Sequence, residues 1–151
     1  MQPIRIIEIP DCKMVSSGVG MFGDENFIAF DAWFSAFPRT KDARDFAAEA
    51  SGGVEWLYMY EDGMSVPRRF NIVEFEGGLY AVNTDIDQQT DIAAMDKELY
   101  AFLHKHGFEQ DKNRRRMGNI ITPPEAEKVM GFNQMDYYMP IKISEGKCVN
   151  G

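Results

Sequence analysis

The sequence predicts an α+β fold in which two strand-helix-strand-strand repeats form one continuous antiparallel sheet, with the helices packed on one side. Two observations lead to this fold class. Segments in which apolar and polar residues alternate, as in half-buried strands, recur along the chain. Two longer segments repeat apolar residues every three or four positions, which is typical of amphipathic helices. Because two such repeats can join their sheets edge to edge, we expect a ligand cleft between the halves.

The length of 151 residues predicts a single domain with a sizeable core. The first half spans about residues 4–76 and the second about residues 77–143, followed by a short tail at 144–151. The two halves share the order of their elements but almost no residue identity. The repeat is therefore one of architecture.

The first half opens with an expected strand from Ile4 to Ile9 and a second at residues 12–22. Asp24 then follows a glycine turn and is a candidate helix N-cap, because its carboxylate can accept from exposed backbone N–H groups. Pro38 stops the helix that follows, since proline cannot continue one. The aromatic stripe of this helix consists of Phe27, Phe30, Phe34 and Phe37.

A second short helix is predicted from Lys41 to Ala50, closing at Gly52-Gly53. One face of this helix would carry Ala43, Phe46, Ala47 and Ala50. Residues 54–62, "VEWLYMYED", alternate as a strand, and "PRRFNIVEFE" at 67–76 is its expected antiparallel partner.

In the second half, a strand at residues 79–86 follows the break at Gly77-Gly78. Thr90 or Asp91 caps a long helix that ends at Gly107. Strands are expected at 114–121 and 135–143, with a short helical connection from Pro123-Pro124 to Met130 between them. The apolar side of the long helix consists of Ile92, Met95, Leu99, Phe102 and Leu103.

Composition and charge restrict the classes of partner. The aromatic share is 13%, so flat rings are available both for a core and for a binding surface. The formal net charge is −8, which disfavours binding to nucleic-acid phosphates. The one basic cluster, "KNRRR" at residues 112–116, is predicted to be an exposed strand start. We therefore expect no direct nucleic-acid binding by this chain.

The remaining motifs predict no metal site, no cofactor and no membrane segment. His104 and His106 are two positions apart on a helix, so they point in different directions. Cys12 and Cys148 are expected to be reduced thiols, with a disulfide as the alternative. No apolar run approaches the roughly 20 residues of a membrane span, and the start of the chain lacks the apolar centre of a signal peptide. We expect a cytoplasmic protein.

The order of the elements resembles the gyrase-inhibitor-like (GyrI-like) small-molecule-binding domain, which is also the effector-binding domain of many AraC-type and MerR-type transcription regulators. The resemblance covers about Ile4 to Ile143. It rests on "EWLYMYED", on "NIVEFEGGLYAV", on Gly107-Phe108 at the end of the long helix, and on the terminal "DYYMPIKI". No helix-turn-helix precedes Met1, so we expect a stand-alone protein or an effector domain cut from a regulator.

The resemblance implies a ligand site lined with aromatic residues in the cleft between the halves. The family's multidrug binders place a buried glutamate on the strand after the second helix, where it meets a lipophilic cation. Here that strand has no acid, and carboxylates elsewhere, such as Glu55 or Asp136, are alternatives. Met117 and Asn119 stand near the expected position. The candidate ligand-binding residues are Trp56, Tyr58, Tyr80, Met117, Asn119 and Tyr138.

The expected function is the binding of a small apolar or aromatic molecule, cations included, for sensing or sequestration linked to transcription regulation. A small-molecule hydrolase that uses a tyrosine with a carboxylate is the alternative on the same scaffold. Inhibition of a topoisomerase by protein contact is a third hypothesis, drawn from the family alone. No sequence spacing identifies a catalytic pair.

The adjacent tyrosines of the last strand predict two different surroundings. A strand points successive side chains to opposite faces, so Tyr137 and Tyr138 cannot both enter one core. Tyr137 alternates in step with the apolar Met139 and Ile141, and we assign it to the core under the helix. Tyr138 is then expected to face the cleft, and Pro140 indicates an edge or a bulge.

Overall fold

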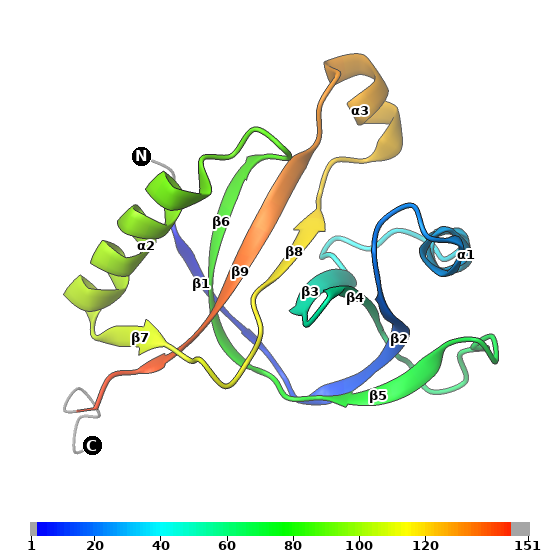
Figure 1. Cartoon of the computed structure of the whole chain (residues 1–151), viewed down its shortest axis with the longest axis horizontal. Coiled ribbons are helices and arrows are strands. Elements are labelled where there is room, and N and C mark those ends of the chain that lie inside the picture. Colours follow the sequence, from blue (N-terminus) through cyan, green and yellow to red (C-terminus); the bar gives the residue numbers. More distant parts are fainter. Residues whose placement is uncertain (1–2, 146–151) are drawn as a thin grey trace. The chain divides into compact units, whose positions relative to one another are not determined.

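The computed structural model describes residues 3–145, and the chain divides into two compact units (Figure 1). Unit 1 comprises Met1–Ile9 and Gly78–Gly151, whereas unit 2 comprises Pro10–Gly77. Each unit combines antiparallel strand pairs with helices, which confirms the predicted α+β class. The cleft expected between the halves stays a prediction. Within residues 3–145, no helix has both the length and the apolar character needed to cross a membrane.

Unit 2 contains four strands and one helix among its described elements. Its strands pair in the order β3-β4-β2-β5. Helix α1 contacts β2 and β4, the two central strands. The elements are β2 (Cys12–Gly20), α1 (Glu25–Phe34), β3 (Asp45–Ala50), β4 (Gly53–Met59) and β5 (Asn71–Phe75).

Unit 1 pairs its strands in the order β1-β6-β9-β8, and a further short strand, β7, also pairs with β9. Strands β7 and β8 pair with different parts of β9, so this strand is the centre of the unit. The elements are β1 (Arg5–Ile9), β6 (Gly78–Ile86), α2 (Ile92–His106), β7 (Phe108–Gln110), β8 (Met117–Ile120), α3 (Pro124–Met130) and β9 (Gln134–Ile143).

Helix α1 carries Phe27, Phe30 and Phe34 of the phenylalanine stripe that the sequence predicts, and Phe37 follows the helix. Phe27 and Phe30 are buried, whereas Phe34 and Phe37 are half-buried against the same cluster. Asp24 occupies the N-cap position, but its carboxylate accepts from the Met21 backbone N–H at 2.8 Å rather than from the helix. The helix ends at Phe34, one turn earlier than the proline suggested.

Helix α2 begins and ends where its capping residues predict. The Asp91 carboxylate accepts from the Ala94 backbone N–H at 3.1 Å, and Gly107 closes the helix in the left-handed conformation with φ 84°. Leu99 and Leu103 are buried in a cluster with Ala81, Met139 and Ile141, while Met95 and Phe102 are half-buried. Ile92 was expected on this apolar side, but 44% of it is exposed.

The helix predicted from Lys41 to Ala50 is wrong, because residues 45–50 form strand β3. Phe46 and Ala48 alternate as buried positions, and β3 pairs along its whole length with β4. Alanine is a strong helix former, but intrinsic propensity is worth less than about 1 kcal/mol per residue, and the pairing with β4 outweighs it. The glycines that we took for a helix end instead close a tight hairpin, in which Ala50 faces Gly53 and Gly52 has φ 83°.

One predicted strand pairing is also wrong. Strand β5 pairs with β2 rather than with β4, and β4 lies between β2 and β3. Strand β4 ends at Met59 and β5 begins at Asn71, so no short hairpin turn joins them and local geometry does not make them partners. The first strand, for which the sequence predicted no partner, pairs with β6.

We expect Phe30→Ala to lower the free energy of unfolding by about 3–5 kcal/mol, because Phe30 is fully buried among aromatic rings. Ile28→Ala is the control on the same helix: its side chain is 62% exposed, so the loss is expected to stay within about 0.5 kcal/mol. Urea denaturation of both variants measures the difference. Equal losses would contradict the packing of α1 described here.

Candidate functional site

The sheet of unit 1 has two faces of different chemistry. One face carries Ala81, Met139 and Ile141, which pack against Leu99 and Leu103 of α2. The pleat directs the alternate residues to the other face. We call this other face the tyrosine face and define it by Tyr80 of β6, Met117 and Asn119 of β8, and Asp136 and Tyr138 of β9.

Four of the six predicted ligand-binding residues lie together on the tyrosine face. The Tyr80 and Tyr138 rings meet edge to face with their centroids 6.2 Å apart. The Tyr138 hydroxyl donates to the Asn119 side-chain oxygen at 3.4 Å, and Met117 stands directly across from Tyr138 in the β8–β9 register. All four side chains are buried. Buried phenols and amides require hydrogen-bond partners, so this face is not an ordinary apolar core.

Asp136 adds a carboxylate to the same face. It lies directly across from Asn119 in the register of β8 and β9. The Thr84 hydroxyl donates to its Oδ1 at 2.5 Å, and the Arg5 guanidinium pairs with the same oxygen at 2.8 Å. The Asp136 side chain is only 8% exposed, so these partners offset the cost of burying a carboxylate.

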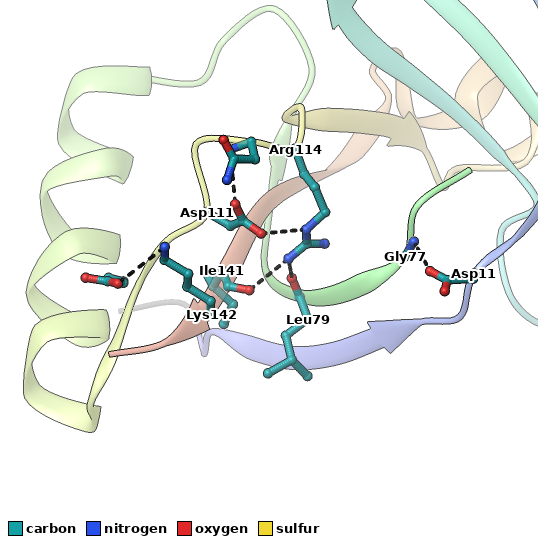
Figure 2. A network of polar contacts seen from close by, with 9 residues as sticks. Asp11, Gly77, Leu79, Asp111, Arg114, Ile141 and Lys142 are labelled. Atoms are coloured by element: carbon teal, nitrogen blue, oxygen red, sulfur yellow. Dashed lines mark hydrogen bonds and ion pairs between the residues drawn. The ribbon is translucent and has the colours of Figure 1, made fainter. Parts of the chain in front are cut away.

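Arg114 holds the start of β6 through a network of polar contacts, which Figure 2 shows. Its Nε donates to Asp111 at 2.9 Å, and its Nη2 donates to the carbonyl oxygens of Leu79 at 3.0 Å and Ile141 at 2.8 Å. The guanidinium carbon lies 4.8 Å from the centre of the Tyr80 ring, a cation–π distance. Hydrogen bonding from Arg114 holds the pKa of the Asp111 carboxyl below its usual range.

Sequence reasoning missed the role of Arg114. We expected the basic cluster at 112–116 to be exposed, but the Arg114 side chain is only 6% exposed. Its acceptors on β6 and β9 are far away in the sequence, so no local pattern reports them. One signal was available in the sequence: Asp111, a residue type that favours turns, stands three positions before Arg114. In the structure Asp111 also accepts from the Asn113 backbone N–H, as in an Asx turn.

The other two predicted ligand-binding residues, Trp56 and Tyr58, lie in unit 2. Both point to the sheet face that α1 covers, where Tyr58 is buried and Trp56 half-buried. Tyr58 stacks on Phe34 with centroids 5.3 Å apart, and Trp56 meets the Phe34 ring edge to face at 5.1 Å. These contacts are those of a helix-packed aromatic core. A ligand role for the two residues stays a prediction.

The Trp56 indole is held by a carboxylate at the rim of this aromatic core. Its Nε1 donates to Asp45 Oδ2 at 3.1 Å. Burial, the largest effect, raises the pKa of the Asp45 carboxyl above its ordinary value, although the hydrogen bond from Trp56 opposes the shift. Asp45 is thus a desolvated acid that the sequence analysis did not single out.

Glu55 lies on the opposite face of the same sheet, because it is adjacent to Trp56 in β4. The Ser16 hydroxyl donates to Glu55 Oε2 at 2.5 Å, and the same Ser16 oxygen accepts from the Gly18 backbone N–H at 3.0 Å. Ser16 is buried and Glu55 half-buried. The serine therefore fixes the position of a carboxylate that solvent can still reach.

The two adjacent tyrosines lie on the faces that the sequence predicts, but their burial is the reverse of the expectation. Tyr137 shares the α2 side with Met139 and Ile141, and its hydroxyl lies 3.0 Å from the Thr90 hydroxyl just before α2. It is only half-buried there. Tyr138 is 6% exposed on the tyrosine face.

Within residues 3–145, no group of three or more His, Cys, Asp and Glu side chains is arranged to hold a metal ion. Cys12 is half-buried in β2, and burial raises the pKa of its thiol. The expected reduced state of Cys148 and the alternative disulfide concern a residue outside the described range.

Comparison with known proteins finds no matching family model and no matching curated protein. Several solved structures share the fold. The crystal structure of the EcmrR C-terminal domain is 13% identical, with a TM-score of 0.63 over 95% of this chain and 99% of that one. In the EcmrR–DNA complex, the chain spans 57% of the longer EcmrR chain, with a TM-score of 0.65 and 12% identity over 93% of this chain.

Two further solved structures share the fold over most of both chains. One is a hydrolase encoded by lin2189 from Listeria innocua, 12% identical, with a TM-score of 0.60 over 93% of this chain and 92% of that one. The other is SAV2435 bound to tetraphenylphosphonium, 10% identical, with a TM-score of 0.53 over 93% and 94%. The fold is therefore that of the EcmrR C-terminal domain and of these two proteins.

We expect Asp45→Asn to raise the free energy of unfolding at pH 7. The raised pKa of Asp45 means that the folded protein disfavours the ionised carboxyl. Asp45 therefore lowers the free energy of unfolding once the pH exceeds the ordinary aspartate pKa of about 3.9. Asparagine keeps an acceptor for Trp56 Nε1 without the charge. The gain should shrink as the pH falls towards 3, where aspartate is protonated in both the folded and unfolded states.

Urea denaturation at pH 7 and at pH 3.5 measures the Asp45→Asn effect. Asp42→Asn is the matched control, because it removes the same charge from an exposed position and is expected to change stability by less than about 0.5 kcal/mol. A loss of stability in Asp45→Asn at pH 7 would contradict the desolvation described above.

Proposed function

We propose that this chain is a GyrI-like small-molecule-binding domain that senses or sequesters an aromatic or largely apolar compound, in a role linked to transcription regulation. The observation that carries this proposal is the contrast between the two faces of one sheet. The buried cluster under α2, with Ala81, Met139 and Ile141, is apolar, and the polar Asn83 and Tyr137 lie beside it on the same face. The tyrosine face buries phenols, an amide and a carboxylate instead. A core needs only the first kind of face.

The chemistry of the tyrosine face fits an aromatic, weakly polar ligand. Ligand sites are mostly apolar, with a few polar groups that orient the molecule. Tyr80 and Tyr138 present rings at nearly right angles, 83° between their planes, so together they can contact an aromatic group by its edge and by its face. Met117 supplies an adaptable thioether. The Tyr138 hydroxyl and the Asn119 amide supply the polar groups.

The charges on this face favour a neutral compound over a cation. Arg5 already pairs with Asp136, so the carboxylate offers no uncompensated negative charge. Arg114 places a second guanidinium against Tyr80. Burial of an additional unpaired cation next to these groups would be costly. The ligand class that these residues support is therefore a neutral aromatic molecule.

Fold similarity supports the regulatory part of the proposal. The chain matches the C-terminal domain of EcmrR, a protein whose structure was solved with DNA, and SAV2435, whose structure was solved with tetraphenylphosphonium. By analogy, the domain would report ligand binding to a DNA-binding partner or domain, whereas a stand-alone chain would sequester the compound.

Triphenylphosphine oxide, a neutral molecule with three phenyl rings, is a suitable probe of the site. We expect the wild type to bind it in a calorimetric titration and Tyr138→Phe to bind it about threefold to tenfold more weakly, the value of one hydrogen bond. Tyr137→Phe is the matched control: it removes the same hydroxyl from the neighbouring position on the α2 side and should leave the affinity unchanged.

The titration also has clear contrary outcomes. Equal losses in Tyr137→Phe and Tyr138→Phe would move the site away from the tyrosine face. Absence of binding to the wild type, for this probe and for a panel of neutral aromatic compounds of similar size, would overturn the proposed function.

The geometry of Glu55 favours a second candidate function, a small-molecule hydrolase. A carboxylate held by Ser16 and still reached by solvent can position a water molecule for attack on an electrophile. The Listeria innocua hydrolase shares the fold. With 4-nitrophenyl acetate as an activated ester, we expect Glu55→Gln to lower turnover at least 100-fold, while Glu74→Gln on β5 leaves it unchanged. Turnover by Glu55→Gln equal to the wild type would exclude this role.

A further inference from the structure

An ion pair spans three strands on the tyrosine face. Arg5 stands across from Val82 in the β1–β6 register, and its guanidinium passes over β6 to reach Asp136 on β9 at 2.8 Å. On the way, Nη2 donates to the Thr84 hydroxyl at 3.3 Å, and Thr84 itself donates to Asp136. The cation of this pair therefore comes from β1, two strands away from Asp136 on β9.

The two members of the pair differ in burial. The Asp136 side chain is 8% exposed, whereas the Arg5 side chain is 51% exposed. A half-exposed guanidinium can return to water at small cost, because an ion pair near the surface contributes little. A buried carboxylate cannot lose its partner without a large penalty. Asp136 therefore requires a cation, but the geometry does not require that this cation be Arg5.

The place of Arg5 lies within reach of the ligand residues. Asp136 is directly across from Asn119 and is two positions before Tyr138 on the same face of β9. Neighbouring side chains on one face of a sheet are about 5–7 Å apart, so a group at Asp136 can also contact the Tyr138 ring. By contrast, Arg114 is buried and bound to three acceptors, so it stays in place beside Tyr80.

We propose that Arg5 is a displaceable internal counter-ion that sets the charge selectivity of the tyrosine face. With Arg5 on Asp136, the face accepts neutral aromatic molecules. A lipophilic cation binds only by taking the position of Arg5 against Asp136, with its rings on Tyr138, while Arg5 moves to solvent. This inference rests on the function proposed above and specifies its ligand class. A purely structural alternative is that the pair only fastens the edge strand β1 to the sheet.

The test compares two probes of the same shape, neutral triphenylphosphine oxide and cationic methyltriphenylphosphonium. Calorimetric titrations give the ratio of the two affinities for the wild type, Arg5→Met and Arg5→Lys. Displacement predicts that Arg5→Met binds the cation at least tenfold more tightly than the wild type does, while its affinity for the neutral probe changes less than threefold. Arg5→Lys keeps a cation near Asp136 and should retain the wild-type ratio.

The doubly substituted Arg5→Met/Asp136→Asn variant identifies the group that the cation meets. Without the carboxylate, the tenfold gain is expected to disappear. Arg5→Met leaves Asp136 unpaired and is expected to melt at a lower temperature than the wild type. Saturating methyltriphenylphosphonium should then raise its melting temperature more than that of the double variant, because a ligand stabilises the state that binds it.

The outcomes separate this inference from the proposed function. A ratio that is the same in the wild type and Arg5→Met, with both probes binding, overturns the role of Arg5 and leaves the ligand site intact. A gain that survives in the double variant also overturns it, since the cation would then not be using Asp136. Failure of both probes to bind any variant overturns the proposed function and this inference with it.

Discussion

The geometry of unit 1 depends on the hydrogen bonds of the Arg114 guanidinium. It lies almost wholly out of water and joins the start of β6, the end of β9 and the turn before β8 through one planar group. Five donors in a rigid plane suit this task, and the shorter, rounder charge of a lysine could not reach two carbonyls and a carboxylate together. Among the described residues, Arg114 Nη1 is buried without a hydrogen-bond partner, as is Asn83 Oδ1 on β6. Gly78 is part of the same arrangement, because a Cβ there would lie 2.7 Å from the guanidinium and its φ of 146° favours glycine.

The tyrosine face follows from this anchoring. Arg114 stands against the ring of Tyr80, and Tyr80 meets Tyr138 edge to face, so each aromatic group is fixed by a neighbour. The polar ends are then fixed by hydrogen bonds, from Tyr138 to Asn119 and from Thr84 to Asp136. Preorganised polar groups of this kind bind a ligand without first losing their own freedom. The same sheet keeps its apolar side for α2, so stability and recognition use different faces.

Local signals in the sequence predicted the elements better than their pairing. Asp91 and Gly107 bounded α2 correctly because capping is decided by adjacent backbone groups. The pleat assigned Tyr137 and Tyr138 to the correct faces for the same reason. The strand at 45–50 was mistaken for a helix because its small residues fit both periods and only β4 decides between them. The burial of Arg114 and the Arg5–Asp136 pair depend on strands remote in the sequence, which no local pattern reports.

The insertion of unit 2 between β1 and β6 has a consequence for the order of assembly. The edge strand β1 is synthesised before the other described elements, yet β6, its partner among the described strands, is synthesised after all of Pro10–Gly77. Unit 2 can therefore form its own contacts before β1 is paired. Pairing of β1 with β6 closes a loop that contains all of unit 2, which makes this pairing a late event. Until then, β1 exposes unpaired backbone groups, a state in which strand edges are prone to associate with other chains. The ion pair from Arg5 of β1 to Asp136 forms only after β9 has been made.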